Sequence, residues 1–268
     1  MHLPGSLPYV PLWLLTVIFF VALIAARELG AFLRTRRERR KAKKSAVVGA
    51  DSVADIGDSF STNTVLGLLA LLIGFTFSLA LGRYDERRSL VLHEANALGT
   101  TWLRTDLLDT SDAEGVRTVL RRYIDARVDF ANAKTARQEV DEYARTTALQ
   151  AELWATVMAA TAPFRDTPRA SLMVTATNES IDLAGERFAA RQDHIPHRVL
   201  RMLFLFSLLA SGLLGYERVR QRTSATLLLL LFSLSVGLVL DLDLPSTGGV
   251  EVPQDPMLDL QRSVGLSS

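Results

Sequence analysis

Hydrophobic residues are concentrated in four long runs, at residues 9–26, 64–81, 199–216 and 225–240, and the remaining sequence is polar or amphipathic. Each run is close to the roughly 17–25 residues that an α-helix needs to cross the hydrocarbon core of a bilayer. The runs contain no Asp, Glu or Lys, and Arg201 lies near the start of its run, where its side chain can reach the interface. A single run of this kind could be a buried core helix. Four in a chain of 268 residues indicate a polytopic membrane protein.

The second run continues into a charged segment without a helix breaker. Gly82 is the only Gly or Pro at the junction, and the ionic residues 83–88 follow it directly. This pattern predicts one helix over residues 62–99, which leaves the bilayer and continues into a water-exposed domain.

Apolar residues between the second and third runs recur at three- and four-residue spacing, which predicts further helices. Ser111 and Glu114 fit a capping box at one helix start, and another helix is predicted over residues 137–161. Thr167, followed by Pro168, is typical of an N-cap, and its helix is expected to reach about residue 194. No stretch alternates with period two, so we predict an all-α protein without a sheet.

The predicted organisation has five parts. They are an N-terminal transmembrane helix with a basic loop (1–61), a second transmembrane helix (62–83), a helical soluble domain continuous with it (84–197), the third and fourth transmembrane helices (198–243), and an extended C-terminal tail with one short helical turn at 257–260 (244–268).

Basic residues cluster after the first span, with nine Arg and Lys between residues 27 and 44. We interpret them as a topology signal that also contacts anionic lipid headgroups, and a docking site for an acidic partner is the alternative. The positive-inside rule then places residues 27–61 in the cytoplasm. Both termini and residues 84–197 are predicted to lie outside a cell (inner) membrane. No basic segment precedes the first run, which favours a retained anchor over a cleaved signal.

Composition and motifs exclude several function classes. The net charge is +1 with clustered bases, which argues against a nucleic-acid partner, and the chain has no Cys to serve as nucleophile or metal ligand. We find no phosphate-binding loop, interpret His93 beside Glu94 as a solvated or packing pair, and expect no metal at His194 and His197. The sequence therefore predicts neither an enzyme nor a cofactor. Without a charge inside the spans an ion-coupled transporter is disfavoured, whereas passive conduction remains compatible.

Small residues form faces on two spans. Gly67, Gly74, Ser78 and Gly82 follow one face of span two, and span three has Ser207, Ser211 and Gly215 at the same spacing. Such faces allow close helix packing, within or between subunits, or, with the hydroxyl groups of Thr76 and Ser78, line a pore in an oligomer.

Charged residues meet at one membrane face, where spans two and four end at the same depth. The cluster consists of Arg83, Arg87, Arg88, Asp241 and Asp243. We predict that Arg83 or Arg87 pairs with one or both aspartates and staples the helix ends together. A selectivity or cation-binding role for the aspartates is the alternative.

Several motifs resemble the bacterial bestrophin-like membrane family, once known only as a domain of unknown function. They are Gly-Phe-Thr-Phe at 74–77, Arg-Tyr-Asp-Glu-Arg-Arg at 83–88, His-Glu-Ala-Asn-Ala-Leu-Gly-Thr at 93–100, Asn-Glu-Ser-Ile-Asp at 178–182, and Asp-Leu-Asp-Leu-Pro at 241–245. The match covers about residues 62–260. A more distant similarity leads to bestrophins, which are pentameric anion channels whose second span lines the pore.

That resemblance implies a homo-oligomer in the lipid bilayer that passively conducts small anions. Span two would line the path, with Phe75 and Phe77 as the only bulky apolar candidates for a neck, and Arg83, Arg87 and Arg88 would draw anions to one mouth. Bestrophins keep the helical domain in the cytoplasm, whereas the basic segment here places it outside. The alternative is a non-conducting scaffold or sensor whose helical domain binds a partner.

Overall fold

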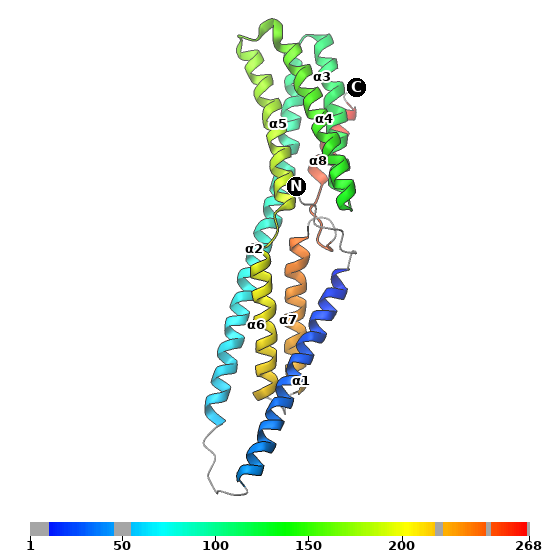
Figure 1. Cartoon of the computed structure of the whole chain (residues 1–268). Helices are drawn as coiled ribbons and strands as arrows, with labels where there is room; N and C mark the ends of the chain where they lie inside the picture. The colour runs from blue at the N-terminus through cyan, green and yellow to red at the C-terminus, as the bar shows by residue number, and fades with distance from the viewer. Residues whose placement is uncertain (1–10, 46–54, 218–221, 245–247, 267–268) are drawn as a thin grey trace. The chain divides into compact units, whose positions relative to one another are not determined.

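The described part of the chain, residues 11–45, 55–217, 222–244 and 248–266, is helical and contains no strand in the computed structural model. The all-α prediction is therefore confirmed (Figure 1). The helices are α1 (Leu12–Ser45), α2 (Asp55–Arg104), α3 (Thr110–Asn132), α4 (Ala136–Thr161), α5 (Pro168–Gln192), α6 (His197–Glu217), α7 (Arg222–Asp243) and α8 (Asp255–Leu266), with 3-10 turns at Thr105–Leu107 and Ala162–Phe164.

Among the described residues, four helical segments are long and apolar enough to cross a membrane: Leu12–Arg40, Thr62–Leu107, Pro168–Glu217 and Arg222–Asp243. The last three each contain a predicted run, and the first contains residues 12–26 of the first run. The chain divides into two compact units. Unit 1 comprises Met1–Gly82 and Ile195–Asp243, and unit 2 comprises Arg83–His194 and Leu244–Ser268.

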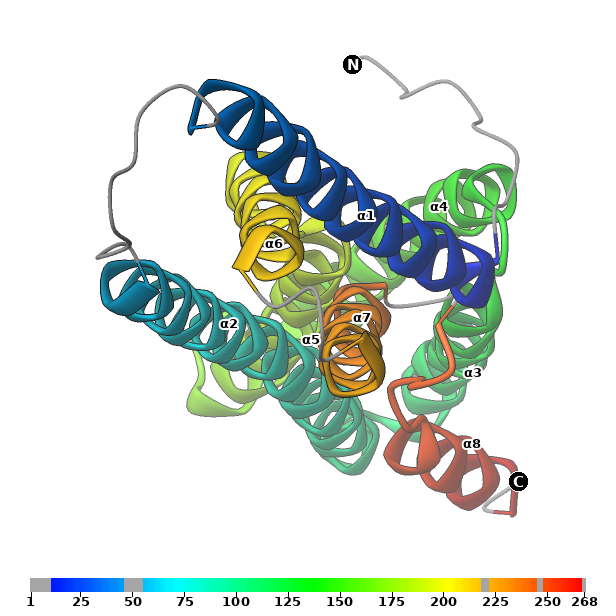
Figure 2. The same ribbon diagram turned by 90° about the horizontal axis from the view of Figure 1, so that it is seen from below.

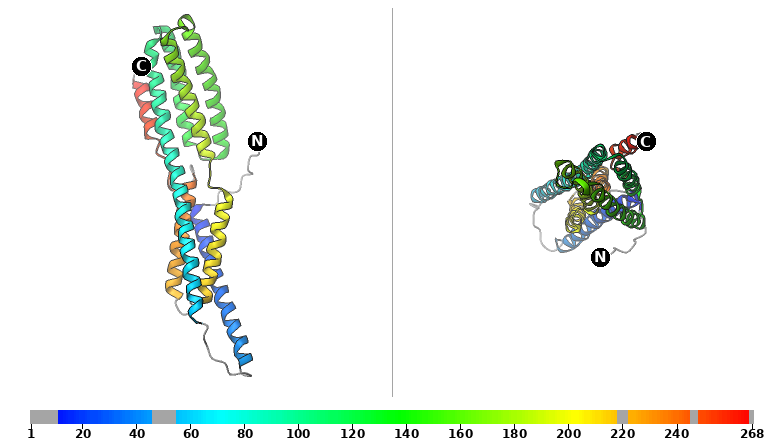
Figure 3. Two further views of the ribbon diagram at one scale, coloured as in Figure 1. Left: turned by 90° about the vertical axis from the view of Figure 1, so that its left-hand side faces the viewer. Right: turned by 90° about the horizontal axis from the view of Figure 1, so that it is seen from above.

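Helix α2 is unbroken over its 50 residues, so the predicted continuous helix is confirmed and extends beyond both expected ends (Figure 3). Its apolar half belongs to unit 1 and its ionic half to unit 2. Gly82 does not interrupt it, because a single Gly costs a helix only about 1 kcal/mol and the flanking residues are good helix formers.

Unit 1 depends on close packing of α1 against α6 and α7 (Figure 2). Gly30 faces the backbone of Gly212, and Gly215 faces the backbone of Arg27, so that a Cβ at Gly30 or Gly215 would overlap the opposite main chain. The Ser211 hydroxyl donates a hydrogen bond to the carbonyl of Leu23 at 2.6 Å. Small residues thus bring two membrane helices into backbone contact.

The basic segment after the first span was expected to be a loop, but α1 continues through it to Ser45. Arg, Lys, Ala, Leu and Glu are good helix formers, and Arg34 pairs with Glu38 one turn later at 2.8 Å. Arg34 also donates to the carbonyls of Tyr216 and Glu217 at 3.0 and 2.6 Å, and Arg27 donates to the carbonyl of Arg222 at 3.2 Å. Arg34 therefore satisfies carbonyls at the C-terminus of α6, and Arg27 ties α1 to the first residue of α7. The middle of the expected loop, 46–54, lies outside the described residues, as do residues 218–221 between α6 and α7.

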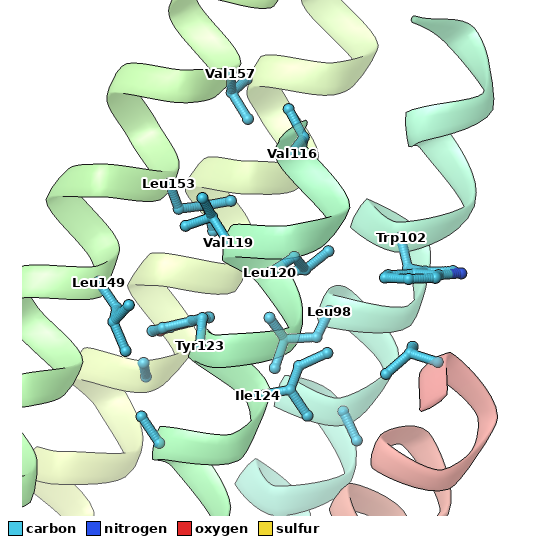
Figure 4. Packing of buried hydrophobic residues seen from close by; sticks show 14 of the residues in the cluster. Leu98, Trp102, Val116, Val119, Leu120, Tyr123, Ile124, Leu149, Leu153 and Val157 are labelled. Atoms are coloured by element: carbon cyan, nitrogen blue, oxygen red, sulfur yellow. The ribbon is translucent and has the colours of Figure 1, made fainter. Parts of the chain in front are cut away.

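Unit 2 has its own hydrophobic core, built by α2, α3, α4, α5 and α8. In Figure 4, Leu98 of α2 lies beside Leu120 and Ile124 of α3, and all three are fully buried. Leu153 and Val157 of α4 complete this layer with no exposed surface.

Three helix starts in unit 2 bear on the capping signals predicted from the sequence. The predicted capping box at Ser111 is wrong, because α3 begins at Thr110 after Asp109, whose backbone is extended. A capping box instead begins α4, where Thr135 and Gln138 exchange hydrogen bonds. Thr167 caps α5 as predicted, accepting a hydrogen bond from the Ala170 amide.

The C-terminal tail was expected to be extended with one helical turn, but α8 forms 12 residues of helix. Met257 and Val264 are buried in the core of unit 2, and their spacing places them on one helix face. The Gln261 amide donates to Asp125 of α3 at 2.7 Å. An amphipathic segment gains its helical stability from such packing rather than from local signals.

Candidate functional site

The small face of α2 is exposed along its whole length in unit 1. Gly67, Gly74, Ser78 and Gly82 are all exposed, and a Cβ at any of these glycines would meet no atom within 4 Å in the described chain. Phe75, beside this face, is 62% exposed. The opposite side of the helix carries buried residues: Leu69, Thr76 and Ala80.

The corresponding face of span three has a different environment. Ser207, Ser211 and Gly215 are buried, and the last two contact α1 of the same chain. Of the two small-residue patterns in the sequence, that of α6 is therefore helix packing within the chain. The small-residue pattern of α2 packs against no other helix among the described residues of unit 1.

The predicted charge cluster divides between the two units. In unit 2, a guanidinium nitrogen of Arg83 lies 3.8 Å from the Asp193 carboxylate, and Arg87 donates to the carbonyls of Ala190 and Asp193 at 3.0 and 2.7 Å. Arg87 is buried there and provides hydrogen-bond donors for the carbonyls at the C-terminal end of α5. Arg88 is exposed.

The two aspartates belong to unit 1. Asp243 is buried and accepts a hydrogen bond from the backbone amide of Ile195 at 2.9 Å, which ties the end of α7 to the entry of α6. Asp241 is half-buried. Pairing of Arg83 or Arg87 with Asp241 or Asp243 stays a prediction.

A buried ionic trio in unit 2 was missed by sequence reasoning. Glu94 of α2 and Arg127 of α3 are both 0% exposed, and Arg187 of α5 is nearly as buried. Two guanidinium nitrogens of Arg127 donate to the two carboxylate oxygens of Glu94, and Arg187 donates to one of these oxygens at 2.6 Å. Arg187 also donates to the Gln254 side chain at 2.5 Å. His93, next to Glu94, is exposed.

The electrostatics of this trio depend on Glu94. Burial by itself lowers the pKa of Arg127, but the nearby charge of Glu94 and its hydrogen bonds outweigh burial, so the pKa is raised. Neighbouring Tyr123 has its pKa raised to about 12, chiefly by burial. Arg127 follows Tyr123 and Ile124 on the apolar face of α3, and an Arg at such a position signals a buried acid elsewhere. With 29 Asp and Glu residues in the chain, the spacing could not say which acid it is.

A family model described as a bestrophin-like domain matches residues 58–257, about three-quarters of the chain. The chain belongs to the bestrophin-like family. This membership confirms the resemblance seen in the sequence motifs. Together with the four apolar helices, it makes the chain a membrane protein of that family.

Solved structures share the fold of this bestrophin-like chain. A crystal structure of a bacterial bestrophin homologue from Klebsiella pneumoniae, carrying a point mutation, is 13% identical with a TM-score of 0.66, and the match covers 92% of this chain and 97% of that chain. Another variant of the homologue gives a TM-score of 0.65 at 13% identity, with 92% and 97% covered. A crystal structure described as a membrane protein gives 0.63 at 13% identity, with 90% and 97% covered. None of the curated proteins matches the chain.

Proposed function

We propose that this bestrophin-like protein assembles as a homo-oligomer in the cell (inner) membrane and passively conducts small anions. The observation that carries the proposal is the exposed small face of α2, which has no partner among the described residues of unit 1. Membrane helices bury small faces against other helices or use them to line a water-filled path. Copies of α2 around a symmetry axis would do both.

The chemistry of the face suits passive anion passage. Gly74, Ser78 and Gly82 leave room and a hydroxyl for a hydrated ion, and Phe75 supplies a bulky apolar group that can narrow the path. Of the three arginines considered at the mouth, Arg88 is the exposed one, so electrostatic attraction of anions is assigned to it. Arg87 is buried, which removes it from the mouth.

Anion flux from liposomes with the purified protein tests the proposal. Gly74→Trp and Ser78→Trp should lower flux at least tenfold, because an indole fills the path. Leu231→Trp is the matched control, since Leu231 is 54% exposed on α7 and lies outside the proposed path. Equal flux in all three variants, from correctly assembled protein, would remove α2 as the lining helix.

A non-conducting scaffold or sensor is the second candidate. Leu92 and Leu103 of α2 are exposed on unit 2 beside a groove of about 740 Å³ that α8 also lines. An exposed apolar groove on a helical domain fits a partner helix. Absence of flux from a well-folded oligomer, under every ion gradient and pH tried, would favour this candidate.

A further inference from the structure

A small basic pocket lies within unit 2, lined by α2, α3, α5 and the segment before α8. Its volume is about 70 Å³. Four cationic side chains line it, against the single carboxylate of Glu251: Arg87, Lys134, Arg187 and Arg191. The α2 residues that line it lie on the opposite side of the helix from the small face.

The cations are arranged in two layers. Arg87 and Arg187 are buried, and the side chain of Arg191 is 11% exposed, so guanidinium groups form the inner wall. Lys134 and Glu251 are well exposed and form an ion pair of 2.6 Å at the rim. The pocket therefore combines buried guanidinium groups, two of which also donate to main-chain carbonyls, with a solvent-exposed ion pair at its entrance.

The inner wall keeps a positive charge. Arg191 is paired with Glu139 at 3.5 Å. Glu94, however, is shared by Arg127 and Arg187, so one carboxylate faces two buried guanidinium groups. Uncompensated charge in a protein interior is costly, and a bound anion in contact with the wall would offset that cost.

We propose that this pocket binds a small oxyanion of the phosphate or sulfate type. Guanidinium forks match the paired oxygens of such anions and bind them more specifically than they bind a spherical halide. The volume is far below the roughly 300–1,000 Å³ of pockets that hold drug-sized ligands, which excludes a nucleotide. The anion approaches through the rim, competes with Glu251 for Lys134, and meets Arg187 inside. This site is separate from the conduction path proposed above.

Isothermal titration calorimetry tests the site on the detergent-solubilised full chain, with inorganic phosphate and sulfate as probes at constant ionic strength. Saturable binding is expected. Lys134→Gln should raise Kd about two- to fivefold, and Glu251→Gln should lower it by a similar factor, as expected for single exposed charges. Opposite signs are informative, because both changes break the same ion pair and a purely structural effect would move Kd in one direction.

Arg122→Gln and Glu152→Gln are matched controls, since that pair is also exposed in unit 2, at 2.7 Å, and does not line the pocket. They should leave Kd unchanged, and melting temperatures without anion should agree among all variants. No saturable binding, equal shifts in the control pair, or a weaker Kd in Glu251→Gln would overturn the proposal. Calorimetry measures anion binding and not ion flux. Absence of binding would therefore leave the proposed channel function untouched, and absence of flux would leave the proposed anion site untouched.

Discussion

At the scale of single residues, the Glu94 trio determines how three helices of unit 2 can be joined. Arg127 meets both oxygens of Glu94, and Arg187 meets one, so a single buried carboxylate from α2 joins guanidinium groups from α3 and α5. Such a network adds geometric specificity to a core whose other members are interchangeable apolar side chains.

Glu94→Gln should be strongly destabilising, by about 3–5 kcal/mol, because it leaves two buried guanidinium groups without their counter-charge. Thermal or denaturant unfolding of the purified protein measures this loss. Arg145→Gln is the control, since its pair with Asp129 is about half exposed at 2.7 Å and should contribute little. Equal destabilisation by both changes would show that the buried trio contributes no more to stability than an exposed ion pair.

Tyr123 makes the stability of unit 2 sensitive to alkaline pH. Its folded-state pKa is raised from 10.0 to about 12, so the neutral phenol stabilises the fold fully below pH 10. That contribution is lost as the pH rises through about 12 and amounts to about 3 kcal/mol at most. Unfolding midpoints between pH 9 and pH 12 should therefore fall more steeply for the natural chain than for Tyr123→Phe. If the unfolding midpoints of the two proteins fall in parallel as the pH rises, the raised pKa of Tyr123 is contradicted.

At the scale of elements, backbone contact between α1 and α6 holds unit 1 together. Gly30 and Gly215 occupy positions where no side chain fits, and hydroxyl groups of α6 and α7 donate to carbonyls of α1. Arg34, after the first span, donates to carbonyls at the C-terminus of α6 and so ties the basic segment to that helix.

Gly215→Ala should separate α6 from α1, since the added Cβ overlaps the Arg27 carbonyl. We expect a loss of about 1–3 kcal/mol, the usual cost of overpacking, seen as a lower melting temperature. Gly185→Ala on α5 is the control, because its Cβ meets nothing within 4 Å and Ala favours a helix. A melting temperature for Gly215→Ala as high as that of the control would show that the helices can move apart at no cost.

At the scale of the whole molecule, the positive-inside rule predicts the membrane topology. The basic run of α1 predicts that residues 84–197 lie outside, whereas bestrophins keep the corresponding domain inside. The chain contains no Cys, so one introduced cysteine reports on its own side without background.

Asp141→Cys, on an exposed turn of α4, should react with a membrane-impermeant thiol reagent in intact cells or spheroplasts. Arg36→Cys, on the exposed face of the basic segment, should react only after permeabilisation. A reporter fused after Ser268 should agree with the first site. The reverse labelling pattern would place the domain in the cytoplasm and give this family member the orientation of bestrophins.

The sequence alone determined the helical class, the four spans, the unbroken α2 and the family, because hydropathy, period and motif are local properties. It failed where long-range contacts decide. Helix α8 exists because Met257 and Val264 pack into the core of unit 2. The capping error at Ser111 is of another kind, because the start of α3 lies only two residues earlier, at Asp109. Only the tertiary structure could choose Glu94 among 29 acids as the partner of Arg127, or separate the small face used by α6 from the one that α2 leaves exposed. Spacing identifies the face of a helix, whereas the opposing surface is assembled from residues far away in the chain.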